Sequence, residues 1–240
     1  MFLGVLQMPV SDDNIQRAYR IRITIFLLCA ALTVVGLSTV YQAIQTLHRL
    51  GVVEHDRDQW QRPAEIMQAL DLREGSVVAD IGSGAGYFAL KLSPAVGKSG
   101  GVLAVDIQRE PLIFLRIRTL LRNQHNVHII RGDPDDPKLP QSAVDAVLIV
   151  NAYHEFEHPQ KILERIRRAL RPSGRLVVAD RGPRPENGDA RDAEVRRHQL
   201  SANLTESELR QSGFELLRRE DRFIDRPDDQ PWWLIVARKP

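Results

Sequence analysis

The sequence predicts an α/β protein with a doubly wound, mostly parallel sheet of seven strands, preceded by one transmembrane helix. Two patterns support this. Between residues 76 and 180, short apolar runs alternate with amphipathic stretches, which is typical of parallel strands joined by helices. Near the N-terminus, a long run without charges precedes this region. A chain of 240 residues has room for one sizeable domain and an appendage.

The apolar run is long enough to cross a membrane. Residues 23–47 are 25 residues without a charged side chain, and a helix of that length spans the ~30 Å hydrocarbon core of a bilayer. We therefore expect an N-terminal tail at residues 1–22 and a transmembrane helix at 23–47. A buried core helix and a cleaved signal peptide are the alternatives.

The charges beside this run bear on its orientation. Arg17, Arg20 and Arg22 precede it, whereas Arg49 and Arg57 follow it among acidic residues. The positive-inside rule therefore leans slightly toward a cytoplasmic N-terminus and an exported body.

Composition excludes several classes of partner. With 33 basic and 31 acidic side chains the net charge is +2, so we expect no nucleic acid partner. Cys29 is the single cysteine, which rules out a disulfide or a thiolate zinc cluster within one chain.

The remaining elements follow in order along the chain. Residues 48–62 are polar and indicate a connection and cover segment before a domain at 63–240, and Pro63 suits the first turn of a short helix. We expect strands at 76–82, 101–107, 127–130, 144–151 and 174–180, and helices at 63–72, 86–96, 111–124 and 159–172. Because the strands are apolar throughout, helices should cover both faces of the sheet.

The C-terminal part has a different pattern. Thr205 and Glu208 have the spacing of a capping box that opens a helix at 206–214. Two strands follow at 215–223 and 231–239, too close for a helix between them, which indicates an antiparallel pair at the edge of the sheet.

Two tryptophans fall in the last of these strands. Trp232 and Trp233 are adjacent and so point to opposite faces of the sheet. We expect one of them in the core and the other near the surface.

A glycine-rich turn joins the first strand to the following helix. Asp80, Gly82, Gly84 and Gly86 form the pattern D-x-G-x-G-x-G. Glycines let the chain turn tightly and let a ligand approach the backbone closely. A dinucleotide-binding loop needs glycine or alanine three residues after Gly84, where this chain has Tyr87.

Polar residues follow the next three strands. Asp106 ends the second strand, Asp133 follows the third, and Asn151 and Tyr153 follow the fourth. Ligands bind at the carboxyl ends of strands in doubly wound sheets. Asp106 is placed to accept hydrogen bonds from two ribose hydroxyls, and Asp133 to meet an adenine amino group.

With this set of motifs, residues 57–240 resemble a class I S-adenosylmethionine-dependent methyltransferase with a Rossmann-like fold. The chain is similar to bacterial small-molecule-type methyltransferases that carry "RDxWQRP" before the domain and "GDPDDPKLP" before the fourth strand. The resemblance implies methyl transfer from S-adenosylmethionine (EC 2.1.1.-), with the acceptor unassigned.

The resemblance also implies site residues. Asp80 and the backbone of residues 82–86 would hold the methionine part of the cofactor. Asp106 would hold the ribose and Asp133 the adenine. The full expected set is Asp80, Gly82, Ser83, Gly84, Gly86, Asp106, Ile107, Asp133 and Asn151. The family often donates a backbone N–H to adenine N1 after the adenine-binding acid, but Pro134 has none.

The acceptor should contact the loop after the fourth strand and the cover segment. The candidates are Asn151, Tyr153, His154, Glu155, Trp60 and Arg62. His154 is the candidate general base, with Tyr153 as the second catalytic candidate. A structural histidine, hydrogen-bonded within its loop, is the alternative.

His154, Glu155 and His158 also form H-E-x-x-H, the signature of helical zinc metalloprotease sites. Pro159 disfavours helical geometry at His158, and Glu164 is too close to serve as a third ligand. We therefore expect the helix to begin after the motif, and no metal. A membrane zinc protease is the least favoured function.

Two other functions remain open. The first is methyl transfer to a small or lipid-soluble acceptor, and the second is a non-catalytic module that binds S-adenosylmethionine for assembly or sensing. Because the cofactor is made in the cytosol, we expect a single-pass membrane protein with its catalytic domain in the cytoplasm, despite the opposite lean of the arginines.

Overall fold

The structure is a computed structural model that describes residues 12–183, 189–227 and 229–240. The chain divides into two compact units, Met1–Val52 and Val53–Pro240. The second unit holds the sheet and begins ten residues before the expected domain boundary at residue 63.

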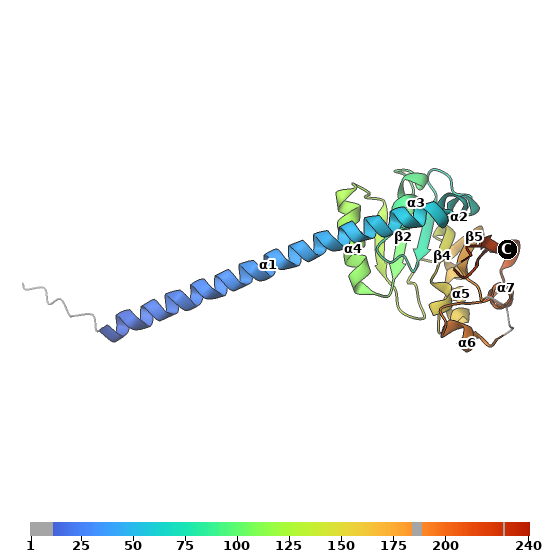
Figure 1. Cartoon of the computed structure of the whole chain (residues 1–240). Helices are drawn as coiled ribbons and strands as arrows, with labels where there is room; N and C mark the ends of the chain where they lie inside the picture. Colours follow the sequence, from blue (N-terminus) through green and yellow to red (C-terminus); the bar gives the residue numbers. More distant parts are fainter. Residues whose placement is uncertain (1–11, 184–188, 228) are drawn as a thin grey trace, which may run out of the picture. The chain divides into compact units, whose positions relative to one another are not determined.

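Helix α1 runs without interruption from Asp12 to Trp60 (Figure 1). Its part from Tyr19 to Trp60 is long and apolar enough to cross a membrane, with a mean hydropathy of 2.4 in its most apolar window and no residue of that window buried. Of the connection and cover segment expected at 48–62, residues 48–60 continue helix α1. Side-chain hydrogen bonds four residues apart support it there, such as Trp60 Nε1 to Asp56 at 3.2 Å.

The sheet has seven strands in the order β3-β2-β1-β4-β5-β7-β6. All neighbouring pairs from β3 to β5 are parallel, whereas β7 is antiparallel to both β5 and β6. The strands are β1 (Val77–Ile81), β2 (Gly101–Asp106), β3 (Val127–Arg131), β4 (Val144–Val150), β5 (Leu170–Arg181), β6 (Glu215–Ile224) and β7 (Trp232–Arg238). This confirms the predicted mostly parallel sheet with an antiparallel pair, β7 and β6, at one edge.

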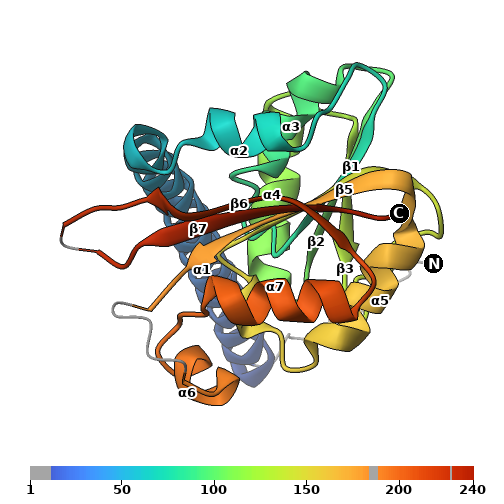
Figure 2. The same ribbon diagram turned by 90° about the vertical axis from the view of Figure 1, so that its right-hand side faces the viewer.

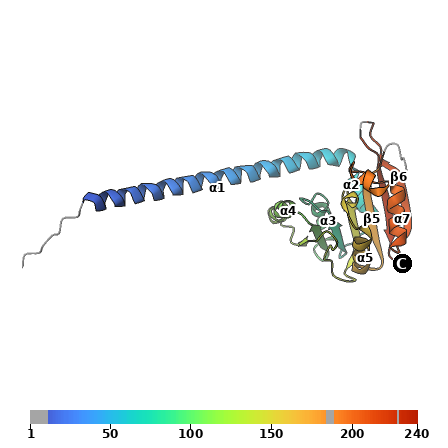
Figure 3. The same ribbon diagram turned by 90° about the horizontal axis from the view of Figure 1, so that it is seen from below.

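Helices cover both faces of the sheet. The helices of the second unit are α2 (Pro63–Ala69), α3 (Ala89–Val96), α4 (Arg109–Leu121), α5 (Pro159–Ala169), α6 (Arg191–Val195) and α7 (Ala202–Gln211). One apolar core lies between the sheet and α2, α3 and α4, and a second lies between the sheet and α5 and α7. Figure 3 shows α3 and α7 on opposite sides of β5. The fold is therefore doubly wound, as predicted.

Several helix ends differ from the sequence prediction, and two of these differences have a clear physical cause. Helix α7 begins at Ala202, and Ser201 caps it by accepting a hydrogen bond from the Leu204 N–H at 3.3 Å. Thr205 is buried inside the helix and is not its cap. Helix α5 ends at Ala169 and not at 172, because the residue before Pro172 disfavours helical geometry.

The expectation for the two tryptophans is also wrong, since both Trp232 and Trp233 are only 1% exposed. Figure 2 shows β7 running beside β6, so β7 has a neighbour on each side and helices over both faces. Trp232 belongs to the first core and Trp233 to the second. Trp233 Nε1 donates to the Leu200 carbonyl at 2.6 Å, which satisfies the buried N–H.

Candidate active site

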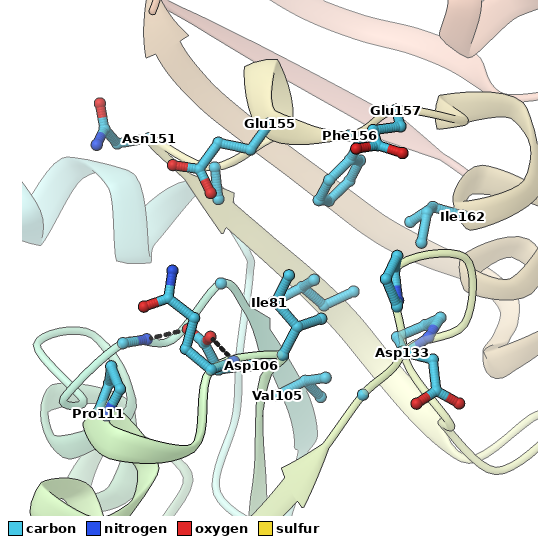
Figure 4. Close-up of a pocket in the computed structure, with 18 residues that line it drawn as sticks. Ile81, Val105, Asp106, Pro111, Asp133, Asn151, Glu155, Phe156, Glu157 and Ile162 are labelled. Carbon is cyan, nitrogen blue, oxygen red and sulfur yellow. Dashed lines mark hydrogen bonds between the residues drawn. The ribbon is translucent and has the colours of Figure 1, made fainter.

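A pocket of about 300 Å³ lies at the carboxyl ends of the first four strands (Figure 4). Its lining comes from the loops after β1, β2, β3 and β4 and from the starts of α4 and α5. The lining residues are Ile81, Gly82, Gly84, Val105, Asp106, Ile107, Gln108, Pro111, Gly132, Asp133, Pro134, Pro137, Asn151, Ala152, Glu155, Phe156, Glu157 and Ile162. The topology therefore places a concave site where doubly wound sheets bind ligands.

The glycine loop after β1 forms one wall, and two of its glycines have different reasons to be glycine. Gly82 has φ +74°, and a Cβ there would come within 2.4 Å of the Ala152 Cβ. Gly84 has φ +53°, and a Cβ there would meet no atom within 4 Å. Gly82 thus allows the loops after β1 and β4 to pack together, while the backbone at Gly84 is open to a ligand.

Asp106 ties the glycine loop to the end of β2. Its Oδ2 accepts the Gly84 backbone N–H at 2.8 Å, and its Oδ1 accepts the Gln108 N–H at 2.8 Å, as drawn in Figure 4. A carboxylate oxygen can accept two hydrogen bonds. Asp106 can therefore hold the loop and still accept hydrogen bonds from two hydroxyl groups of a ligand.

Three buried oxygens around this loop have no hydrogen-bond partner among the residues that the structure describes. They are Asp80 Oδ2, Ser83 Oγ and Asn151 Oδ1. Asn151 also has a positive φ of 55°. Buried polar atoms are nearly always satisfied, so such a cluster indicates polar groups that a ligand or water would complete.

The carboxyl of Asp80 is tuned by its surroundings. Burial raises its pKa to about 7, while a hydrogen bond from the Ala89 backbone N–H and the charge of Arg57 act in the opposite direction. Near neutral pH this group is therefore poised between its neutral and charged forms. A positive charge bound beside Asp80 would favour the ionised form.

Asp133 lines the pocket but turns its carboxylate away from Asp106 (Figure 4). The carboxylate is paired with Lys138 Nζ at 2.9 Å. The Asp133 backbone N–H donates to the Asp136 carbonyl at 2.8 Å, and Pro134 has no N–H. The loop after β3 therefore lines the pocket, while the carboxylate of Asp133 is directed toward Lys138.

Tyr153 and His154 lie in the short 3-10 helix η1 (Tyr153–Glu155) and are both buried outside the lining of the pocket. The Tyr153 hydroxyl donates to Glu208 at 2.7 Å, and burial raises the pKa of Tyr153. The His154 Nδ1 lies 2.9 and 3.0 Å from the two oxygens of Asp180.

The other ring nitrogen of His154 approaches a residue that lines the pocket. His154 Nε2 lies 3.9 Å from Oε1 of Glu155, a half-exposed residue that lines the pocket. Burial lowers the pKa of His154, but the hydrogen bond and charge of Asp180 outweigh it, so the pKa lies above its ordinary value. Asp180 thus fixes the orientation of the ring.

Comparison with known proteins identifies the part of the chain that builds this pocket. Residues 79–178, from β1 into β5, match the family described as "Methyltransferase domain". The chain carries a class I methyltransferase domain. S-adenosylmethionine is the methyl donor of this family.

Curated relatives of this domain act on different acceptors. Protein-L-isoaspartate O-methyltransferase 2 of Archaeoglobus fulgidus is 32% identical over 117 residues, which cover 48% of this chain and 50% of that protein. A ubiquinone/menaquinone biosynthesis C-methyltransferase of Pseudomonas entomophila is 32% identical over 110 residues, covering 45% and 43%. The alignments thus span about half the length of these relatives, and the two names give different acceptors.

Solved structures share the fold of the domain. An S-adenosylmethionine-dependent methyltransferase from Aquifex aeolicus has a TM-score of 0.63 and 23% identity, over 75% of this chain and 90% of that one. The [4+2]-cyclase SpnF has a TM-score of 0.64 and 20% identity, over 75% and 80%. The Rossmann-like methyltransferase fold is thus shown.

The residues of the methyltransferase domain fit S-adenosylmethionine. The open backbone at Gly84 and the unsatisfied oxygens of Asp80, Ser83 and Asn151 suit a polar, cationic amino-acid group. Asp106 suits a ribose, and the apolar part of the lining, with Ile107, suits a purine ring.

The structure brings most of the expected cofactor residues to the pocket. Those that line it are Gly82, Gly84, Asp106, Ile107, Asp133 and Asn151. Asp80 and Ser83 are buried and do not line the pocket, and Gly86 faces α4, where its Cβ would come within 2.3 Å of Leu115. Gly86 therefore serves the packing of the loop against the helix.

The zinc signature does not lie on one helix. Helix α5 begins at Pro159, with His158 at its N-cap, and this confirms that the helix follows the motif. Among the described residues no group of three His, Cys, Asp or Glu side chains could hold a metal ion.

Several residues of the site were missed by the sequence reasoning. Gln108, Phe156 and Glu157 line the pocket, and Asp180 and Glu208 hold His154 and Tyr153 from behind. Phe156 and Glu157 directly follow the nominated loop, so adjacency alone could have found them. Glu208 is 55 residues from Tyr153 and needed the fold.

Proposed function

We propose that this protein transfers a methyl group from S-adenosylmethionine to an acceptor that is small or lipid-soluble. The observation that carries the proposal is the pocket at the strand ends, with three unsatisfied buried oxygens beside an open glycine backbone. The match of residues 79–178 to the methyltransferase domain supports the same conclusion.

Methyl transfer requires the protein mainly to position the two reactants. S-adenosylmethionine, when bound, supplies a methyl group activated by its sulfonium. The chain's own residues must align the acceptor, exclude water and accept a proton where the acceptor carries one. We assign cofactor binding to Asp106, Ile107 and the glycine loop, with Asp80, Ser83 and Asn151 completing its polar contacts.

Glu155 and His154 are the candidate residues to take a proton from the methyl acceptor. Glu155 presents its carboxylate to the pocket, and His154 Nε2 lies 3.9 Å behind it. Asp180 holds the ring from the other side, so a proton gained at Nε2 would be stabilised. Tyr153, whose hydroxyl is engaged by Glu208, would act as a positioning residue for this loop.

We further propose that residues 23–47 anchor the protein in a membrane, with the catalytic domain in the cytoplasm. The exposed apolar surface of α1 supports an anchor. The cytosolic supply of S-adenosylmethionine favours the inward orientation. An anchored domain would meet lipid-soluble acceptors at the membrane surface.

The test is transfer of label from S-adenosylmethionine by the full chain. Purified protein in detergent, incubated with membranes and a methyl-labelled cofactor, should label one extractable product. Asp106→Ala should abolish the label, because it removes the acceptor of the Gly84 and Gln108 N–H groups. Cofactor binding without any labelled product from membranes or soluble extract would contradict the enzymatic proposal.

The second candidate is a module that binds the cofactor without methyl transfer. The burial of Tyr153 and His154 outside the pocket lining favours it. The shared fold of the [4+2]-cyclase SpnF shows that this architecture alone does not fix the reaction. Binding of S-adenosylmethionine by the chain, with no methyl transfer to any component of a membrane or soluble extract, would support this candidate.

A further inference from the structure

Residues 53–60, the last two turns of α1, belong to the second unit and contact its glycine loop. Arg118 of α4 is only 5% exposed and is paired with Glu54 from these turns. The same guanidinium donates to the carbonyl of Ala85, inside the glycine loop, at 2.5 Å. One buried cation therefore joins the end of α1 to the loop that walls the pocket.

A second connection lies two residues further along the loop. The Tyr87 hydroxyl donates to Asp58 at 2.7 Å, and Lys91 Nζ lies 2.8 Å from the same carboxylate. The guanidinium of Arg57 stacks 3.8 Å above the Tyr87 ring. Burial raises the pKa of Asp58, but the hydrogen bonds from Lys91 and Tyr87 and the charge of Lys91 together outweigh it, so the pKa lies below its ordinary value and the carboxylate stays ionised.

Resting on the proposed function, we propose that Glu54 and Asp58 are positioning residues of the cofactor site. Through Arg118 and Tyr87 they hold the glycine loop in the conformation that binds S-adenosylmethionine. The last turns of α1 would then set the affinity for the cofactor without touching it.

The geometry explains how such an effect would reach the ligand. Ala85 lies directly after Gly84, the residue whose open backbone faces the pocket and whose N–H is bound by Asp106. If Glu54 loses its charge, the buried guanidinium of Arg118 keeps only neutral partners and must turn toward water to be solvated. The hydrogen bond to Ala85 would then weaken, and the Gly84 peptide would lose its fixed orientation.

The chain offers a matched control in the same two turns. Asp56 is also a carboxylate on this segment, but it accepts a hydrogen bond from Trp60 and is exposed. Within the described part of the chain, Asp56 makes no hydrogen bond or ion pair with the glycine loop. Asp56→Asn therefore removes a charge from the segment without removing a link to the loop.

The experiment compares the Kd for S-adenosylmethionine of the full chain in detergent with those of Glu54→Gln, Asp58→Asn and Asp56→Asn. Glu54→Gln should raise the Kd by about tenfold, within the range that residues outside a ligand site can produce. Asp58→Asn should raise it several-fold, and Asp56→Asn should leave it within about twofold of wild type. Binding is measured well below the Tm of every variant.

The outcomes separate this inference from the function on which it rests. A lower Tm with an unchanged Kd in both Glu54→Gln and Asp58→Asn would mean that the contacts serve stability alone, and would overturn it. If Glu54→Gln fails to fold, the Kd of Asp58→Asn tests the inference. The Asp58 side chain is exposed and contacts the loop independently, through its hydrogen bond with Tyr87. Failure of the wild-type chain to bind the cofactor would overturn the proposed function as well.

Discussion

At the scale of single residues, Asp80 makes the sharpest connection between burial and ligand binding. Its folded pKa of about 7 lies above the ordinary 3.8 because the carboxyl is buried. The contribution of this group to stability is therefore present below about pH 3.8 and is lost as the pH rises through about 7. Burial disfavours the charged form of Asp80, and a cation bound beside the carboxylate would offset this penalty.

Cofactor affinity should therefore depend on pH through Asp80. Between about pH 5.5 and 7 the ionised fraction of a group with a pKa near 7 rises roughly fifteenfold, and the affinity for the cationic cofactor should rise with it. Asp80→Asn should bind more weakly and show a flatter profile. Calorimetric titration at several pH values measures both, and parallel profiles for the two proteins would refute the role of Asp80.

Asp106 and Asp133 should differ strongly, although the sequence placed them alike at strand ends. Asp106 accepts two backbone N–H groups in the pocket, whereas Asp133 pairs with Lys138 and turns outward. Asp106→Asn should weaken cofactor binding by about tenfold or more, because charge-assisted hydrogen bonds are lost. Asp133→Asn should change the Kd by less than about threefold. Equal losses in the two variants would contradict this reading of the pocket.

The sequence pattern placed the candidate cofactor residues correctly at the strand ends, but it did not reveal the partners of the side chains in the site. Asp80 lies near the end of β1, and Gly84 and Asn151 follow β1 and β4, so the strand pattern alone placed them at one edge of the sheet. Asp180 could have been paired with His154 only from the register of β4 against β5, where Val150 lies opposite Ala179. The outward turn of Asp133 depends on Lys138, a loop contact that no periodicity reveals.

At the scale of elements, the turn from β1 into α3 makes a test of two glycines possible. Gly84→Ala should fold with a loss of about 1–2 kcal/mol, because only the positive φ is strained and no atom lies within 4 Å of the new Cβ. The methyl group would stand on the wall of the pocket, so cofactor binding should fall by more than about tenfold.

Gly82→Ala should behave differently, since its Cβ would come within 2.4 Å of Ala152. We expect a fall in Tm well beyond that of Gly84→Ala, measured by thermal unfolding. The pair therefore separates a glycine needed for packing from one needed for binding. Full cofactor affinity in Gly84→Ala would show that the ligand does not approach that backbone.

Element boundaries show where local sequence signals mislead. Ser201 and Thr205 are both residue types that favour the N-cap position. The helix begins after Ser201, with Ala202 and Thr205 both buried against the rest of the domain. Similarly, a polar composition suggested a connection at residues 48–62, yet helix α1 continues to Trp60. In both cases tertiary contacts prevail over local propensity.

At the scale of the whole molecule, the proposed anchor predicts the behaviour of the chain in cells. The full protein should stay in the membrane fraction after washing with high salt and alkaline carbonate, whereas a chain starting at Val53 should not. A reporter fused after Pro240 should be active in the cytoplasm. An exported reporter would separate the domain from its cofactor supply and contradict the proposed location.

We expect the pocket at the ends of β1 to β4 to bind S-adenosylmethionine. Titration of the purified full chain with this cofactor and, separately, with NAD measures this binding. One S-adenosylmethionine should bind per chain, Asp106→Asn should weaken this binding, and the dinucleotide should not bind. An absence of S-adenosylmethionine binding by a folded wild-type chain would contradict this expectation.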